Sequence, residues 1–249
     1  MPPTIAFDKL GTGSPVILVL GAFNTRAAGA PLAAALAANH TVLNYDRRGR
    51  GESGDEAPYA VQREIEDLDT LVGRVGGAAA VFGFSSGAAL ALAAAAHGIA
   101  ITRLALFDLP LTVGPPVNQV DHAAALDELV RAGRRGDAVE YFQRALVGLP
   151  EPVIAKLRHA PFRPGLEAMA HTLVYEAAIL GDHLLSLEQA RRVRIPTLAI
   201  AAGAAPPFMR ETAEALARAV PDGRVLVIEG ATHDLVPEVL APPLLRFYA

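Results

Sequence analysis

The residue most able to do chemistry in this chain is a serine that has a glycine two positions away on each side. Positions 83–87 read Gly-Phe-Ser-Ser-Gly, after an apolar run at 78–82 typical of a buried strand and before an alanine-rich run at 88–96 typical of a buried helix. Ser85 would then lie in a sharp strand-to-helix turn, where the glycines prevent a clash and the hydroxyl is exposed. The pattern predicts a nucleophilic serine, and the alternative is an ordinary glycine-bounded turn.

A serine hydroxyl becomes a good nucleophile only when a base removes its proton, so Ser85 requires a histidine nearby. His233 is the best placed of the seven histidines, because it follows the last expected strand in the sequence Gly-Ala-Thr-His-Asp. A loop there can carry a side chain over the carboxyl edge of a sheet. His97 and His40 are expected at the opposite end and to be structural or surface residues. Four more fall in a helical region and could line a pocket or lie exposed: His122, His159, His171 and His183.

Strand-like and helix-like segments alternate along the chain, which indicates an α/β fold with a mostly parallel, doubly wound sheet. Strands are expected at 4–9, 16–20, 41–45, 78–82, 101–107, 197–201 and 225–228, and helices at 31–38, 61–75, 86–97, 208–219 and from about 237. From 111 to 194 the strand signals give way to helical patterns broken by prolines. We therefore expect a core formed by 1–110 and 195–249, with 111–194 as a helical cap inserted into it.

Composition narrows the class of protein. The chain has 249 residues, of which 52% are hydrophobic, and a net charge of −4, which argues against nucleic acid as its partner. It has no cysteine and no H-E-x-x-H or P-loop pattern, so neither a thiolate metal site nor a nucleotide phosphate site is expected. No signal sequence or membrane-spanning run is apparent. These features lead us to expect a cytoplasmic protein that works without a metal or other cofactor and does not bind membranes.

Taken together, these motifs resemble the α/β-hydrolase superfamily, in particular its serine esterases and lipases, over essentially the whole chain. Residues 18–23, Leu-Val-Leu-Gly-Ala-Phe, are similar to the strand and glycine turn that supply an oxyanion-hole amide in that family. Residues 46–53 match the family's D-x-R-G-x-G-x-S loop, which implies a structural turn rather than a phosphate site. The serine turn and the late histidine complete the resemblance, in the family's chain order.

The resemblance implies an oxyanion hole made by the backbone N–H groups of Ser86 and Ala22, with Phe23 as the alternative to Ala22. Such amides stabilise the negative oxygen of a tetrahedral intermediate. The chain departs from the family at Leu20, where a histidine is common before the glycine. That departure leaves open which hydrogen bonds hold this loop.

A second departure concerns the acid that orients the histidine. Most relatives have an aspartate after the strand that follows the insertion, but residues 202–207 here read Ala-Gly-Ala-Ala-Pro-Pro. Some members have the acid one strand earlier, where this chain has Asp108, so we predict that Asp108 orients His233; its alternative role is to cap the turn before Pro110. Asp234, adjacent to the histidine, and Asp182, in the insertion, are weaker candidates.

The resemblance thus implies a cofactor-independent serine hydrolase that cleaves an ester, lactone or thioester of a small to medium apolar substrate through an acyl-enzyme. The same fold and residues could instead serve C–C bond hydrolysis, perhydrolase or haloperoxidase-like chemistry, or the tailoring of a secondary metabolite, and a catalytically silent binding protein is a third possibility. The oligomeric state stays open. Five side chains are expected to line the substrate pocket: Phe23, Phe142, Leu146, Met169 and Phe208.

Overall fold

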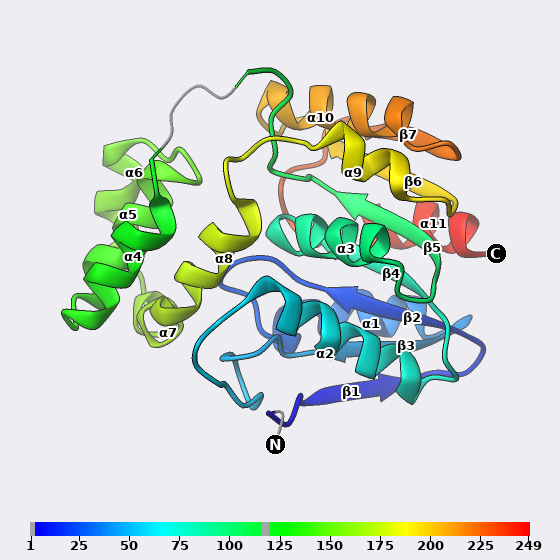
Figure 1. Cartoon of the computed structure of the whole chain (residues 1–249), viewed down its shortest axis with the longest axis horizontal. Helices are drawn as coiled ribbons and strands as arrows, with labels where there is room; N and C mark the ends of the chain where they lie inside the picture. The colour runs from blue at the N-terminus through cyan, green and yellow to red at the C-terminus, as the bar shows by residue number, and fades with distance from the viewer. Residues whose placement is uncertain (1–2, 116–119) are drawn as a thin grey trace.

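A seven-stranded sheet forms the centre of the molecule in this computed structural model, which describes residues 3–115 and 120–249 (Figure 1). The strands lie in the order β1-β3-β2-β4-β5-β6-β7. Their bounds are Phe7–Leu10 for β1, Ser14–Val19 for β2, His40–Tyr45 for β3, Ala79–Phe84 for β4, Ile101–Phe107 for β5, Thr197–Ala202 for β6 and Gly223–Ile228 for β7. Only β1 is antiparallel to its neighbour, and the other neighbouring pairs are parallel. The expected mostly parallel α/β sheet is confirmed.

Helices cover both faces of this sheet, as the crossovers between parallel strands require. One face carries α1 (Arg26–Leu36) and α11 (Pro237–Tyr248), and the other carries α2 (Val61–Arg74), α3 (Ser86–His97) and α10 (Pro207–Ala219) (Figure 1). Central strand β2 shows how the two faces form from one sequence. Because side chains alternate along a strand, Ile17 and Val19 join the core under α2 and α3, while Val16 and Leu18 join the core under α1 and α11. All four are fully buried.

The alanine-rich segment after the serine forms α3, with the bounds expected from sequence. Its residues Ala88, Ala91 and Ala94 are fully buried, as is Leu90. Small side chains let the helix approach β4 and β5 closely, so a helix that is apolar nearly all round is suited to this central position. The helix begins directly at the serine turn.

The first expected strand begins later than the sequence indicated. Residues 4–6 belong to no strand and instead bond to the loop after β3. The Ala6 carbonyl accepts from the Asp46 N–H at 3.0 Å, and the Thr4 carbonyl accepts from the Gly54 N–H at 2.9 Å. The alternation that predicted a strand at 4–9 therefore covers both this loop contact and β1 itself.

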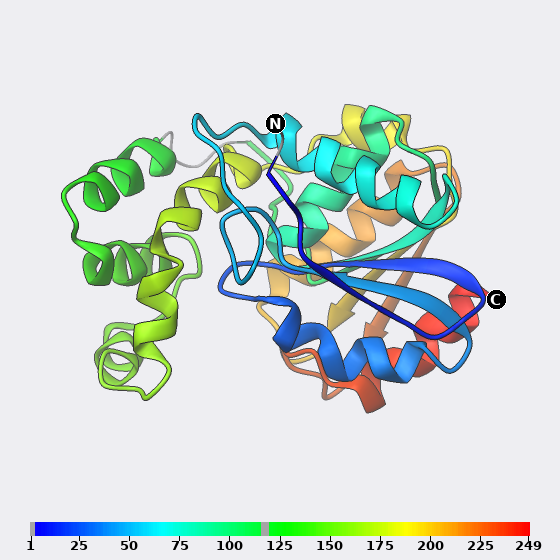
Figure 2. The same cartoon turned by 90° about the horizontal axis from the view of Figure 1, so that it is seen from below.

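Six α-helices and one 3₁₀ helix of the described residues lie between β5 and β6; we call this segment, residues 111–194, the insertion. They are α4 (His122–Arg131), α5 (Arg135–Ala145), α6 (Glu151–Leu157), α7 (Arg163–Ala168), η1 (Ala170–Thr172), α8 (Leu173–Leu180) and α9 (Leu187–Arg192). Helices α4 to α8 stand beyond the carboxyl ends of the parallel strands (Figures 1 and 2), and α9 packs back against α3 and α10. The insertion has an apolar core of its own around Leu126, Phe142 and Leu173, against which Phe23 packs.

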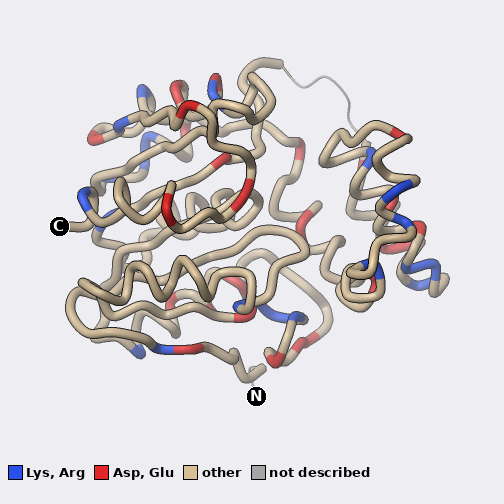
Figure 3. Tube along the Cα trace, turned by 180° about the vertical axis from the view of Figure 1, so that it is seen from behind, with Lys and Arg blue, Asp and Glu red and all other residues tan. Residues whose placement is uncertain are grey.

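Charged residues of both signs are scattered over the core and the insertion (Figure 3). In the described part of the chain, no helix has the length and apolar character needed to cross a bilayer.

Candidate active site

Ser85 lies at the junction of β4 and α3, as the sequence predicted, in an unusual backbone conformation. Its φ of 56° and ψ of −129° are rarely adopted by a residue with a side chain and cost of order 1–3 kcal/mol. The turn is held because the Ser85 N–H donates to the Phe107 carbonyl at 2.9 Å and its carbonyl accepts from the Ala88 N–H at 2.8 Å. A strained and well-fixed serine of this kind fits the nucleophile turn of the family.

The glycines on either side of the serine are required by close packing. A Cβ on Gly83 would lie 2.6 Å from the Cα of Ala88, and a Cβ on Gly87 would lie 2.3 Å from the carbonyl oxygen of Val19. Real Cβ atoms do not approach backbone atoms so closely, so β4, α3 and β2 can meet at this point only without these side chains. The glycines thus have the steric role that the sequence suggested.

His233 and Asp108 form a hydrogen-bonded pair beside this turn. The Nδ1 of His233, in the loop after β7, lies 2.8 Å from Oδ2 of Asp108, at the end of β5. The Asp108 side chain is fully buried and the His233 side chain is 37% exposed. Since Asp108 can only accept when ionised, Nδ1 carries the proton in this assignment and Nε2 is the nitrogen left to act as a base. The His233 ring also packs on Phe84, with centroids 4.8 Å apart.

The second oxygen of Asp108 is used as well. Its Oδ1 accepts a hydrogen bond of 2.8 Å from the N–H of Ala202, the last residue of β6. The strand end that lacks a carboxylate thus supplies a backbone donor that fixes the carboxylate of its neighbour. The two weaker candidates are bonded elsewhere, because Asp234 accepts from the Thr232 hydroxyl and Asp182 from the Leu184 N–H.

The loop after β2, residues 20–24, runs beside the serine turn. The N–H of Ala22 donates to Oγ of Ser86 at 2.9 Å. The N–H of Phe23, whose φ is 60°, has no acceptor within the described ranges 3–115 and 120–249. The N–H of Ser86 belongs to the first turn of α3, where amides have no partner inside the helix. All three predicted oxyanion donors therefore gather here, with the Ala22 amide occupied by a hydroxyl.

A cavity of about 640 Å³ opens above these groups, between the sheet and the insertion. Ser85, Ser86 and His233 line it together with Ala22 and Asn24, and its other walls are mainly apolar. They include Phe23, Phe84, Pro110, Phe142, Leu146, Val147, Leu149, Leu180, Pro206, Phe208, Met209 and Leu235. Asp234 also lines it. Phe23 and Phe142 meet edge to face, with ring centroids 5.5 Å apart.

Four of the five side chains expected to bind substrate therefore line this cavity, namely Phe23, Phe142, Leu146 and Phe208. Met169 does not line it. This residue is the C-cap just after α7, and its carbonyl accepts from the amide and hydroxyl of Thr172. Five further lining residues were not predicted from sequence, namely Asn24, Val147, Leu149, Leu180 and Leu235. Spacing gave no signal for them, since they lie at loop and helix ends.

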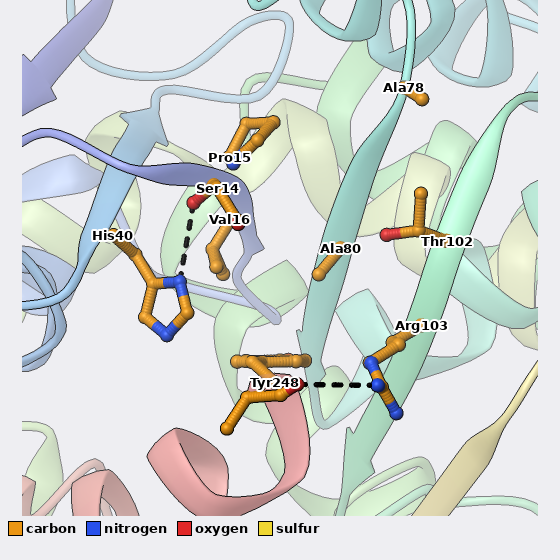
Figure 4. A pocket seen from close by; sticks show the side chains of 10 residues that line it. Ser14, Pro15, Val16, His40, Ala78, Ala80, Thr102, Arg103 and Tyr248 are labelled. Atoms are coloured by element: carbon orange, nitrogen blue, oxygen red, sulfur yellow. Dashed lines mark hydrogen bonds between the residues drawn. The ribbon is translucent and has the colours of Figure 1, made fainter.

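The remaining histidines lie outside this cavity. His122 contacts the Tyr141 hydroxyl, with Nδ1 and oxygen 2.9 Å apart, and its ring meets His183. His171 lies near Asp55. His40 lines a different cavity of about 360 Å³ at the amino ends of the strands, where its Nδ1 is 3.2 Å from the Ser14 carbonyl and Arg103 reaches the carbonyl oxygen of Ala249 (Figure 4). That cavity is at the opposite edge of the sheet from Ser85.

The arginine-rich loop is buried and its charges are neutralised within the protein. Arg47 contacts Glu64 of α2 through two nitrogens at 2.7 Å, and Arg48 contacts Asp67 in the same way at 2.8 and 2.9 Å. Burial opposes ionisation of Glu64, but the Arg47 guanidinium outweighs this and holds the pKa of Glu64 below its usual value. These guanidinium groups are structural, in agreement with the interpretation of this loop as a turn.

No group of three histidine, cysteine or carboxylate side chains suited to a metal ion occurs in the part of the chain that the structure describes. The groups gathered at the cavity are a serine, a histidine bonded to a buried aspartate, and backbone amides.

Comparisons with known proteins agree with this fold. The sequence profile of the Alpha/beta hydrolase family matches residues 16–242, and the chain belongs to this family. An alpha/beta hydrolase from Sphaerobacter thermophilus DSM 20745 is 50% identical, with a TM-score of 0.92 over 99% of this chain and 97% of that one. A comparison with curated proteins gave no match.

More distant solved structures share the fold. A thermophilic esterase from Thermogutta terrifontis, solved with malate bound, is 25% identical, with a TM-score of 0.71 over 97% of this chain and 89% of that one. An enol-lactonase from Burkholderia xenovorans LB400 is 23% identical, with a TM-score of 0.69 over 98% and 96% of the two chains. Solved structures with this fold thus include an esterase and an enol-lactonase.

Proposed function

We propose that this protein is a serine hydrolase that cleaves an ester, lactone or thioester of a small to medium apolar compound through an acyl-enzyme. The single observation that carries the proposal is the buried Asp108 bonded to His233 at 2.8 Å, with His233 and Ser85 lining the same apolar cavity. An esterase and an enol-lactonase among the structural relatives support these substrate classes.

In the proposed reaction, Oγ of Ser85 attacks the carbonyl carbon of the substrate while Nε2 of His233 takes the hydroxyl proton. Asp108 holds the imidazole through Nδ1–H and stabilises the imidazolium that forms. The carbonyl oxygen becomes an oxyanion, which the N–H groups of Phe23 and Ser86 stabilise, because the Ala22 N–H donates to Oγ of Ser86. The intermediate collapses as His233 returns the proton to the leaving group, and water activated by His233 then hydrolyses the acyl-enzyme.

The walls of the cavity support an apolar substrate. Aromatic and aliphatic side chains from the core and from the insertion face a space of about 640 Å³, within the usual size range for small-molecule sites. An acyl chain there would lose contact with water, which favours binding by about 0.8 kcal/mol for each buried methylene.

Labelling with a fluorophosphonate probe tests the proposal. The wild-type protein is expected to react through Ser85 and to hydrolyse members of a panel of p-nitrophenyl esters and lactones, whereas Ser85→Ala should do neither. If wild type and Ser85→Ala behave alike in both assays, this function is wrong.

A further inference from the structure

Three consecutive carbonyl oxygens of the 20–24 loop are each held by a side chain. The Leu20 carbonyl accepts from Arg47 at 3.1 Å, the Gly21 carbonyl from Arg50 at 2.6 Å and the Ala22 carbonyl from Nδ2 of Asn24 at 2.8 Å. No carbonyl of this stretch is left to rotate freely toward the cavity. Arg47 and Arg50 thus do more than pair with carboxylates, because they also fix the backbone of this loop.

Fixing these carbonyls also fixes the amides that follow them. A peptide unit is planar and trans, so its N–H points opposite to its C=O. The Gly21 carbonyl that Arg50 holds belongs to the same unit as the Ala22 N–H, which points at Oγ of Ser86. The Ala22 carbonyl likewise shares its unit with the unpartnered Phe23 N–H. Of these two amides, the Phe23 N–H is the free one within the described part of the chain. Arg50 holds the loop on either side of it, at the Gly21 carbonyl and, at 3.4 Å, at the Asn24 carbonyl, so Arg50 helps to fix the direction of this donor.

Arg50 is itself anchored by the insertion. It contacts Oε1 of Glu176 on α8, an oxygen that Arg47 also reaches at 2.9 Å. Glu176 is fully buried and Arg50 is 1% exposed, so neither charge can turn to water for an alternative partner. Helix α8 packs on α4 of the insertion on one side and on α3 on the other. A displacement of α8 would therefore displace the guanidinium that holds Gly21.

We propose that Arg50 is a positioning residue for the oxyanion hole, and that Glu176 makes the orientation of the hole depend on the seating of α8. This inference rests on the proposed hydrolase function. It also explains how the loop is held although Leu20 stands where a histidine is common in the family. The guanidinium groups of Arg47 and Arg50 supply hydrogen bonds to this loop.

The first test is Arg50→Lys, with Arg48→Lys as its matched control. Lysine keeps the charge but lacks the planar fork needed to reach Gly21 and Glu176 together. Arg48 lies in the same loop and is as deeply buried, but its partners are Asp67 and the Arg63 carbonyl. Arg50→Lys should lower kcat by about ten- to a hundredfold with KM within about threefold, because oxyanion contacts form in the transition state. Arg48→Lys should keep kcat within about twofold, even if its thermal midpoint falls equally.

Inhibitor binding separates positioning from a general loss of structure. A trifluoromethyl ketone forms an adduct with Ser85 that carries an oxyanion, whereas the alcohol product carries none. Arg50→Lys should lower the affinity for the ketone by the same factor by which it lowers kcat, and should leave the affinity for the alcohol within about twofold of wild type. If the affinities for the ketone and the alcohol fall equally, or if Arg48→Lys lowers kcat as much as Arg50→Lys does, the positioning role is wrong.

Glu176→Gln provides a second variant that keeps both arginines. It should reduce kcat in the same direction, and the double variant with Arg50→Lys should lose less than the product of the two single effects, because both act through one contact. If the double variant loses the full product of the two single effects on kcat, the link between Arg50 and α8 is wrong. If the wild-type protein neither reacts with the fluorophosphonate nor hydrolyses any ester, the proposed function itself fails, an outcome distinct from these.

Discussion

Asp108 combines total burial with a full set of hydrogen bonds. One carboxylate oxygen meets His233 and the other meets the amide of Ala202, and its own backbone has a positive φ of 50°. A buried charge is tolerated only when it is paired and bonded in this way. The side chain is therefore held in one orientation before any substrate arrives.

Replacing Asp108 by asparagine should remove the acceptor that holds the Nδ1 proton and so favour the wrong tautomer of His233. We expect kcat for a p-nitrophenyl ester to fall by about 10⁴-fold, with KM within a few-fold. Steady-state kinetics at pH 7 check this. Asp182→Asn, on a carboxylate bonded to the Leu184 amide, is the control and should keep wild-type kcat; an active Asp108→Asn would exclude the assigned role.

At the residue scale, the sequence was most informative where chemistry depends on local pattern. Ser85 could be predicted because strand, turn and helix follow one another within a few residues. Glu176 could not, since its contact with Arg47 joins positions 129 residues apart. The available signal was a single carboxylate within the apolar stretch 173–180, because lone charges on buried helices are usually paired. Asn24 offered no comparable signal.

Among the elements, the loop after β3 and helix α2 are joined by two buried ion pairs, each made through two nitrogens of an arginine. Glu64 on α2 meets two nitrogens of Arg47 and also accepts from the Tyr59 hydroxyl at 2.8 Å. Tyr59 in turn stacks on Tyr175 of α8, with ring centroids 4.0 Å apart. The same loop therefore connects the core to the insertion through both charge and aromatic contact.

The lowered pKa of Glu64 predicts a dependence of stability on pH. The unfolded chain takes up a proton at this group near the usual pKa of about 4.3, before the folded protein does, so the stabilisation present above that pH is lost as the pH falls through the folded pKa. Thermal midpoints measured from pH 7 to pH 3 should decline. Glu64→Gln should be less stable by about 3–5 kcal/mol at pH 7 but should decline less steeply. Equal slopes would contradict this assignment.

Elements with a strong pattern were predicted best. Helix α3 and strands β2, β5 and β6 lie within a residue or two of the expected bounds, since continuous apolar runs and glycines mark them. The start of β1 was misplaced, because the segment before it, which bonds to a loop, continues the alternation of the strand. Helix ends in the insertion depended on prolines, which indicate where a helix can begin but not how it packs.

At the scale of the whole molecule, the cavity exists because the insertion stands over the carboxyl edge of the sheet. Phe23 connects the sheet to the insertion, since it lies in the loop after β2 and packs on the apolar core of the insertion. The volume available to a substrate therefore depends on side chains contributed by two separately packed parts. Sequence could indicate that an apolar roof exists, but the directions of its side chains depend on how the insertion helices pack, which is why Met169 was placed in the pocket.

Replacing one of the lining side chains by a larger one should shorten the acyl chain that the cavity accepts. Leu146, at the end of α5, lines the cavity, so Leu146→Trp fills part of its volume. In a series of p-nitrophenyl esters from acetate to octanoate, kcat/KM should peak at a shorter chain than in wild type. Val153→Trp, on an exposed position of α6, is the control and should leave the peak in place. An unchanged peak for Leu146→Trp would place the acyl chain elsewhere.

The hydrogen bond from the Ser85 amide to the Phe107 carbonyl joins the serine to the residue just before Asp108. The proposed nucleophile and acid are therefore both held by the hydrogen bonds between β4 and β5, whereas the proposed base, His233, lies in a separate loop. On gentle heating, activity should disappear as that loop loosens, while the sheet and the spacing of the other two groups persist.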